Sequence, residues 1–272
     1  MRTDRLPALA LAHLTLLEVP PAALVALAAR AGFAAVGLRL APAHPGGIAY
    51  ACHPGSAAFV DLRARMDGEG VRVHDIEFVT IGPDFDAAML TPVLDQAAAL
   101  GAARLSACGD DPDPARLAAR FAALCDLAAT YAMGVDLEWM GWRPVATLQD
   151  ALRTVRAAAR PNGAILVDAL HLIRNGGAPA DLHGLDPGLI RAVQLCDAAA
   201  TPPARREGII AEARGGRLLP GAGALPLRAL LEALPEDAVL SCEIPLANPP
   251  PPERLAREVF AATARLFGQE GG

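Results

Sequence analysis

Short apolar segments with strand character alternate eight times with segments of helical character along the 272-residue chain. Strands that alternate with helices in sequence indicate βαβ units, and therefore a parallel sheet. The predicted strands span residues 8–14, 34–40, 71–79, 102–108, 134–140, 163–169, 190–197 and 238–244. This alternation constrains the fold more than any other feature, because each strand must be connected to the next one through a helix.

The segments between the strands carry helix starts and stops, such as Pro at residues 20 and 21 and Gly32 after the first helix. The predicted helices span residues 20–32, 56–69, 86–100, 113–132, 145–159, 226–234 and 251–267, with a short helical passage near 170–190. After the seventh strand we expect a polar loop, rich in Gly and Arg, that runs to Gly223.

Eight strand–helix pairs in a chain of this length predict an α/β fold, the (β/α)8 barrel or TIM barrel, as a single domain over residues 1–272. An open doubly wound sheet is the alternative. The first strand lacks the Gly-rich fingerprint of open dinucleotide-binding folds, and this favours the barrel.

The composition limits the partners and the chemistry. The net charge is −6 and the basic residues form no run, so we expect neither nucleic acid nor a membrane as partner. All 24 basic residues are Arg, which excludes a lysine Schiff base. The five cysteines have no C-x-x-C spacing, and we find neither a clear signal peptide nor a membrane-spanning stretch. These features predict a cytoplasmic protein.

Four successive predicted strands end in oxygen donors. Glu138 ends the fifth strand, Asp168 the sixth, Gln194 lies in the seventh and Glu243 in the eighth, and His171 follows one helical turn after Asp168. In a barrel these strand ends meet at one face, where active sites lie. Three converging carboxylates would repel one another unless a cation lay between them. A buried Asp168 is therefore explained if it is a metal ligand.

The order Glu, D-x-x-H, Gln, P-G-x-G and Glu over these strands and the loop at residues 220–223 resembles the sugar phosphate isomerase/epimerase superfamily. These xylose isomerase-like barrels include ketose 3-epimerases, hydroxypyruvate isomerase, inosose dehydratase and 3-dehydroshikimate dehydratase. The resemblance covers essentially the whole chain and does not specify the substrate. The endonuclease IV branch needs more histidines than the six present, and we exclude it.

The resemblance implies that one divalent cation is bound by Glu138, Asp168, Gln194 and Glu243. Many relatives have His where this chain has Gln194. An amide oxygen is a harder ligand than imidazole, so we expect Mn²⁺ or Mg²⁺, with Co²⁺ or Zn²⁺ left open.

Other residues are expected to contact the substrate. The resemblance implies this for His171 and for Arg217, which precedes the P-G-x-G loop. Asp197 is expected to orient a ligand or to bind substrate, and Trp142 to form an apolar wall or only to pack. His13, His44, His53 and His74 could face the pocket, or could be core and loop histidines.

The resemblance further implies an isomerase or epimerase that acts through an enediolate on a sugar or related small keto compound. Glu138 and Glu243 would be its acid–base pair. The same apparatus could expel a hydroxyl, so a dehydratase (a lyase) is an alternative, as is a non-catalytic barrel that serves as a binding subunit. A small-molecule substrate is the expected partner, and homo-oligomerisation is left open.

Overall fold

The structure is a computed structural model that describes residues 6–268. Eight strands, each parallel to its neighbours, pair in chain order, and β1 pairs with β8 to close the barrel. They are β1 Leu9–Leu11, β2 Ala35–Leu38, β3 Arg72–Ile81, β4 Arg104–Gly109, β5 Gly134–Glu138, β6 Gly163–Asp168, β7 Ile190–Leu195 and β8 Val239–Cys242. The predicted barrel is confirmed, and the open sheet is excluded.

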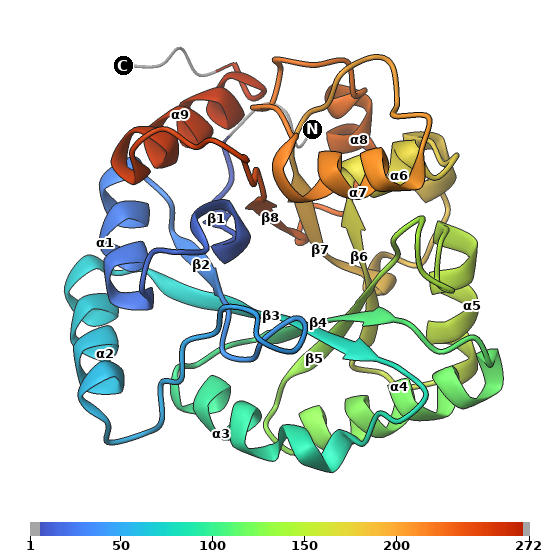
Figure 1. Ribbon diagram of the computed structural model, residues 1–272, viewed down its shortest axis with the longest axis horizontal. Coiled ribbons are helices and arrows are strands. Elements are labelled where there is room, and N and C mark those ends of the chain that lie inside the picture. The colour runs from blue at the N-terminus through green and yellow to red at the C-terminus, as the bar shows by residue number, and fades with distance from the viewer. Residues whose placement is uncertain (1–5, 269–272) are drawn as a thin grey trace.

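The helices surround the barrel (Figure 1). They are α1 Pro21–Ala31, α2 Ala57–Glu69, α3 Thr91–Ala99, α4 Pro114–Ala129, α5 Leu148–Ala158, α6 Ala169–Arg174, α7 Arg206–Gly215, α8 Leu227–Ala233 and α9 Pro252–Arg265. Short 3₁₀ turns are η2 His13–Leu16, η3 Ala87–Leu90, η4 Pro179–Leu182 and η5 Pro187–Leu189. Within the described part of the chain, no helix combines the length and apolar character needed to cross a bilayer.

Local signals explain where helices begin and end. Thr147 and Asp150 form a capping box at the start of α5, where each side chain accepts from the other residue's backbone N–H. Gly32 ends α1 with a φ of 106°, a conformation that glycine adopts without steric cost. Helix α4 buries Leu117, Phe121 and other apolar residues against the barrel. The predicted helices at these places are confirmed.

The segment after β7 differs from the prediction of one loop to Gly223, because it contains α7. Its sequence has few apolar residues, so helical periodicity is weak. Tertiary contacts stabilise it instead. Glu212 of α7 is largely buried and accepts two hydrogen bonds from the Arg174 guanidinium of α6, at 2.8 and 2.9 Å.

The barrel interior also contains acidic groups below the strand ends. Asp75 and Glu77 of β3 point toward Gly37 of β2, where a Cβ atom would lie 2.9 Å from Asp75 Oδ1 and closer still to Glu77. The Ser106 hydroxyl donates to Asp75 Oδ2 at 2.9 Å. Burial, and to a smaller extent the charge of Glu77, raise the pKa of Asp75 to about 8. Asp75 is therefore largely protonated at neutral pH.

This shift predicts a pH-dependent stability for Asp75→Asn. Between about pH 4, the ordinary pKa of aspartate, and about pH 8, folded Asp75 binds a proton that the unfolded chain releases, so the wild type loses stability as pH rises. Asn still accepts from Ser106 and does not titrate. Urea denaturation should show the variant gaining stability relative to wild type from pH 5 to pH 8. An equal difference at both pH values would contradict the assignment.

Candidate active site

A cavity of about 300 Å³ opens at the carboxyl ends of the strands. Pockets of this size accommodate small metabolites. Its polar lining comes from most of the strand ends and from the loops that follow them: Arg39, Glu77, Ser106, Glu138, Arg143, His171, Gln194, Arg214, Arg217 and Glu243. The loop between β2 and α2, drawn in blue in front of the strands in Figure 1, contributes His44 and Ile48.

Asp168 is the last residue of β6 and is fully buried. Its Oδ1 accepts from the backbone N–H of His171 at 3.0 Å and so caps α6. Its Oδ2 accepts from Arg217 Nη1 at 2.6 Å. Burial alone would raise the pKa of Asp168, but the charge of Arg217 holds it below the ordinary value. The buried carboxylate is therefore kept ionised.

Arg217 bridges two of the predicted metal ligands. Besides the bond to Asp168, its Nη2 lies 3.0 Å from Glu243 Oε2. Its Nε donates to the Ala213 carbonyl at 3.0 Å, which fixes the direction of the guanidinium. With only 2% of its side chain exposed, Arg217 serves as an internal counter-ion between β6 and β8.

The amide of Gln194 is oriented by Glu243. Gln194 Nε2 donates to Glu243 Oε1 at 2.7 Å. Gln194 Oε1 is buried and has no hydrogen-bond partner among residues 6–268. An unpartnered buried acceptor is costly unless a ligand satisfies it. Burial raises the pKa of Glu243 to about 8, against the opposing charge of Arg217.

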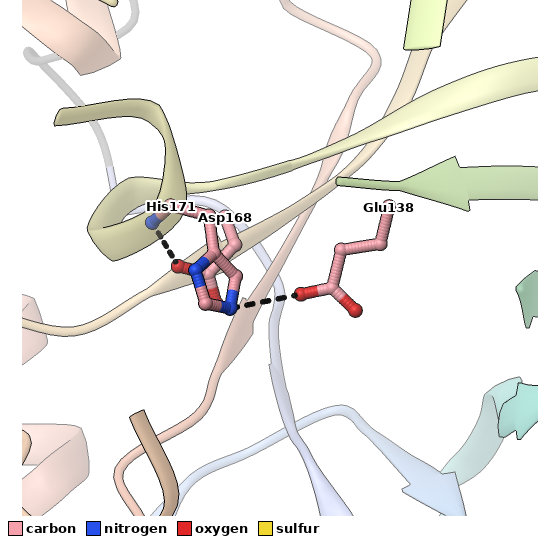
Figure 2. A group of neighbouring side chains, drawn as sticks. All are labelled: Glu138, Asp168 and His171. Atoms are coloured by element: carbon pink, nitrogen blue, oxygen red, sulfur yellow. Dashed lines mark hydrogen bonds and ion pairs between the residues drawn. The ribbon is translucent and has the colours of Figure 1, made fainter. Parts of the chain in front are cut away.

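Glu138 ends β5 and faces His171 (Figure 2). His171 Nε2 lies 3.7 Å from Glu138 Oε1, and single ligand atoms of Glu138, Asp168 and His171 lie within 4.8 Å of one another. Burial raises the pKa of Glu138 well above its ordinary value, and the charges of Asp168 and Glu243 add to this. Burial also lowers the pKa of His171 to about 4, so its imidazole is neutral near pH 7.

These residues fit a divalent cation. When ionised, the three carboxylates of Glu138, Asp168 and Glu243 carry more negative charge than the one guanidinium of Arg217 can balance, and a divalent ion would compensate the excess. The unpartnered Gln194 oxygen supplies a further hard ligand. The four predicted ligands thus share one site, although their binding of metal stays a prediction. The structure adds the His171 imidazole as a fifth candidate ligand, because its ring lies within 4.8 Å of ligand atoms of Glu138 and Asp168.

Of the two other residues expected to contact the substrate, Trp142 lines the cavity and Asp197 is buried outside it. Trp142 lines the cavity and meets the His171 ring edge-to-face, with ring centroids 5.2 Å apart. Asp197 is buried beneath the P-G-x-G loop and accepts four backbone hydrogen bonds, from Ala198, Gly221, Gly223 and Leu225. Its carboxylate holds that loop in place, which agrees with an orienting role, while a direct contact with substrate stays a prediction.

Of the four histidines that could have faced the pocket, one lines the cavity and three do not. His44 lines the cavity. The His13 ring is bonded on both sides, to the backbone N–H of Arg39 and the carbonyl of Val19, and is a core residue. His74 lies near the opposite, amino-terminal end of the barrel, and His53 is exposed.

Several polar residues that line the cavity were not predicted from the sequence, among them Arg39 and Ser106. Arg39 directly follows the apolar strand β2, as Asp168 ends β6. A charged residue after a buried strand was therefore a signal that could have identified it. Ser106 offered no comparable signal, because a single Ser within a strand is common.

The sequence matches the family model described as xylose isomerase-like TIM barrel over residues 25–266. The chain belongs to this family. Among solved structures, this fold is found in a protein with a bound zinc atom, in a probable dehydratase and in an epimerase. No curated protein matches the sequence closely enough to count as a relative.

Three solved structures illustrate the likeness. The IolI protein with a bound zinc atom has a TM-score of 0.79 and 18% identity, over 96% of this chain and 98% of that one. The probable 3-DHS dehydratase AsbF of Bacillus anthracis has a TM-score of 0.75 and 14% identity, over 95% and 99%. D-allulose 3-epimerase of Methylomonas sp., in complex with D-allulose, has a TM-score of 0.69 and 16% identity, over 95% and 96%. At these identities the likeness shows the fold alone.

The chain also aligns with one part of a longer protein. A xylose isomerase-like TIM barrel/4-hydroxyphenylpyruvate dioxygenase fusion protein matches 95% of this chain with a TM-score of 0.79 and 20% identity. The match covers 42% of that protein.

The bridging role of Arg217 predicts the effect of Arg217→Met. Removing one partner of a buried ion pair costs about 3–5 kcal/mol, so the free energy of unfolding in urea with a chelator should fall by that amount. Added Mn²⁺ should restore part of it, because the ion supplies the lost positive charge. Arg214→Met removes an exposed charge of the same cavity and should change stability by less than about 0.5 kcal/mol. Equal effects of the two substitutions would refute the counter-ion role.

Proposed function

We propose that the protein is a divalent-metal-dependent isomerase or epimerase acting on a sugar or related small hydroxy ketone. The main support is that Glu138, Gln194 and Glu243 line the cavity, that Asp168 lies beside Glu138 and Arg217, and that the buried Gln194 oxygen is unpartnered within the described chain. The zinc bound to the IolI protein and the D-allulose bound to the epimerase are consistent with this class.

The four donors would hold the cation, and the all-oxygen set favours Mn²⁺ or Mg²⁺. When bound, the cation would supply a Lewis acid for the carbonyl and hydroxyl oxygens of the substrate. Arg217 keeps Asp168 and Glu243 in place beside it. His171 and Trp142 form one wall of the cavity.

Glu138 and Glu243 are suited to move the proton. They extend from β5 and β8, strands separated by β6 and β7, so a substrate between them would have a carboxylate on each side. Gln194 and Arg217 orient Glu243, while Glu138 meets only the His171 imidazole at 3.7 Å among described partners. One glutamate would remove the proton next to the carbonyl, and the other would return it to the opposite face.

A dehydratase is the second candidate, and the apolar part of the cavity favours it. Leu14, Leu17, Ile48, Phe78 and Met140 line the cavity together with the polar groups. A sugar hydroxyl against these side chains would lose its hydrogen bonds to water without replacement. A ring with fewer hydroxyls fits better, and AsbF, a probable dehydratase, has this fold.

Deuterium exchange tests the proton transfer. The metal-loaded protein in D₂O should incorporate deuterium next to the carbonyl of at least one ketose in a panel that includes D-allulose. Glu138→Gln or Glu243→Gln should slow this exchange by about two to four orders of magnitude. Glu236→Gln, on the exposed surface, is the matched control and should leave the rate unchanged. Loss of water from a ring hydroxy ketone, without exchange into any ketose, would favour the dehydratase.

Metal competition tests the role of Gln194. Imidazole prefers softer ions than an amide oxygen, so Gln194→His should raise the affinity for Zn²⁺ relative to Mn²⁺, and Gln194→Ala should weaken both. Calorimetric titrations of the three proteins would measure the two affinities. If neither substitution alters the Zn²⁺/Mn²⁺ ratio or the Mn²⁺ affinity, Gln194 is not a ligand.

A further inference from the structure

Arg39 lies on the opposite side of the barrel from Asp168, one of the predicted metal ligands. It directly follows β2, which is four strands away from β6 in the closed barrel. Only 3% of the residue is exposed, yet its side chain lines the cavity. A buried arginine requires compensating partners, because removing a guanidinium from water costs several kcal/mol.

The surrounding residues fix Arg39 in place. Its backbone N–H donates to His13 Nδ1 at 2.9 Å. Its guanidinium carbon lies 5.2 Å from the centre of the Phe78 ring. These contacts position the side chain before any ligand arrives, and such preorganisation lowers the cost of binding.

The hydrogen bonding of Arg39 is nevertheless incomplete. Its one ionic contact is from Nη2 to Glu77 Oε2, at 3.3 Å. Both oxygens of Glu77 already accept backbone hydrogen bonds, from His13 at 2.6 Å and Leu14 at 3.1 Å. Arg39 Nε is buried and has no hydrogen-bond partner in the described chain. The guanidinium therefore keeps unused hydrogen-bond donors at the cavity.

We propose that Arg39 binds a carboxylate of the substrate, so that the substrate is a hydroxy keto acid. The proposal rests on the proposed function and narrows its substrate class. The planar fork of arginine matches the two oxygens of a carboxylate. A neutral hydroxyl would accept from only one donor of the fork. Leu14, Leu17 and Ile48 also line the cavity and would contact the carbon skeleton.

A pair of isosteric probes tests this directly. 3-Hydroxybenzoate and 3-hydroxybenzamide have the same shape, and only the first carries a carboxylate. In calorimetric titrations of the metal-loaded protein, the benzoate should bind at least about tenfold more tightly than the amide, a difference of about 1.4 kcal/mol. Arg39→Gln should reduce this preference to about twofold or less. Arg228→Gln removes an exposed charge on α8, outside the cavity, and should retain it.

Arg39→Lys keeps the charge but loses the fork, and it also serves if Arg39→Gln does not fold. We expect an intermediate preference in the Lys variant. A wild-type protein without a carboxylate preference would overturn the proposal. So would no measurable binding of the benzoate at about 10 mM, or a full preference in either Arg39 variant.

The proposed reaction and the role of Arg39 can be refuted separately. A carboxylate preference that depends on Arg39, in a protein that binds no metal and exchanges no proton, would refute the proposed function and support the role of Arg39. Exchange into neutral ketoses by a protein that has no carboxylate preference would do the reverse.

Discussion

The ion pairs of Arg217 with Asp168 and Glu243 are the interaction on which the site depends. They allow two carboxylates to remain at the ends of buried strands, where an uncompensated charge would destabilise the barrel. They also orient Glu243, which in turn orients Gln194 through its amide group. The Gln194 oxygen is left unpartnered within the described chain as a consequence. The Arg217 guanidinium is thus a fixed counter-ion that holds the carboxylates in position for a second, removable counter-ion, the proposed divalent cation.

Much of the fold was predictable because alternating strand and helix periodicity is a local property of the sequence. Strand order and closure follow, since parallel strands joined by helices have few arrangements. Helix α7 was not predictable in this way, because the ion pair between Arg174 and Glu212 joins residues 38 positions apart. No local pattern in residues 206–215 contains that information.

The candidate site was predictable in part. The donors at strand ends were visible because each follows an apolar run, and the barrel brings such ends together. The sequence did not reveal that the Asp197 carboxylate accepts hydrogen bonds from four backbone N–H groups. These bonds depend on the conformation of the loop, which no local pattern specifies. It also gave no sign that Arg217 pairs with two ligands, since that depends on the direction of its guanidinium.

The central claim is that the protein binds one divalent cation between Arg217's carboxylate partners and Glu138. Anomalous diffraction from crystals grown with Mn²⁺ tests it most directly. The account predicts one strong peak, at about 2.0–2.6 Å from Gln194 Oε1 and from carboxylate oxygens of Glu138, Asp168 and Glu243. A peak elsewhere, or no peak at saturating Mn²⁺ with the Arg217 ion pairs intact, would contradict it.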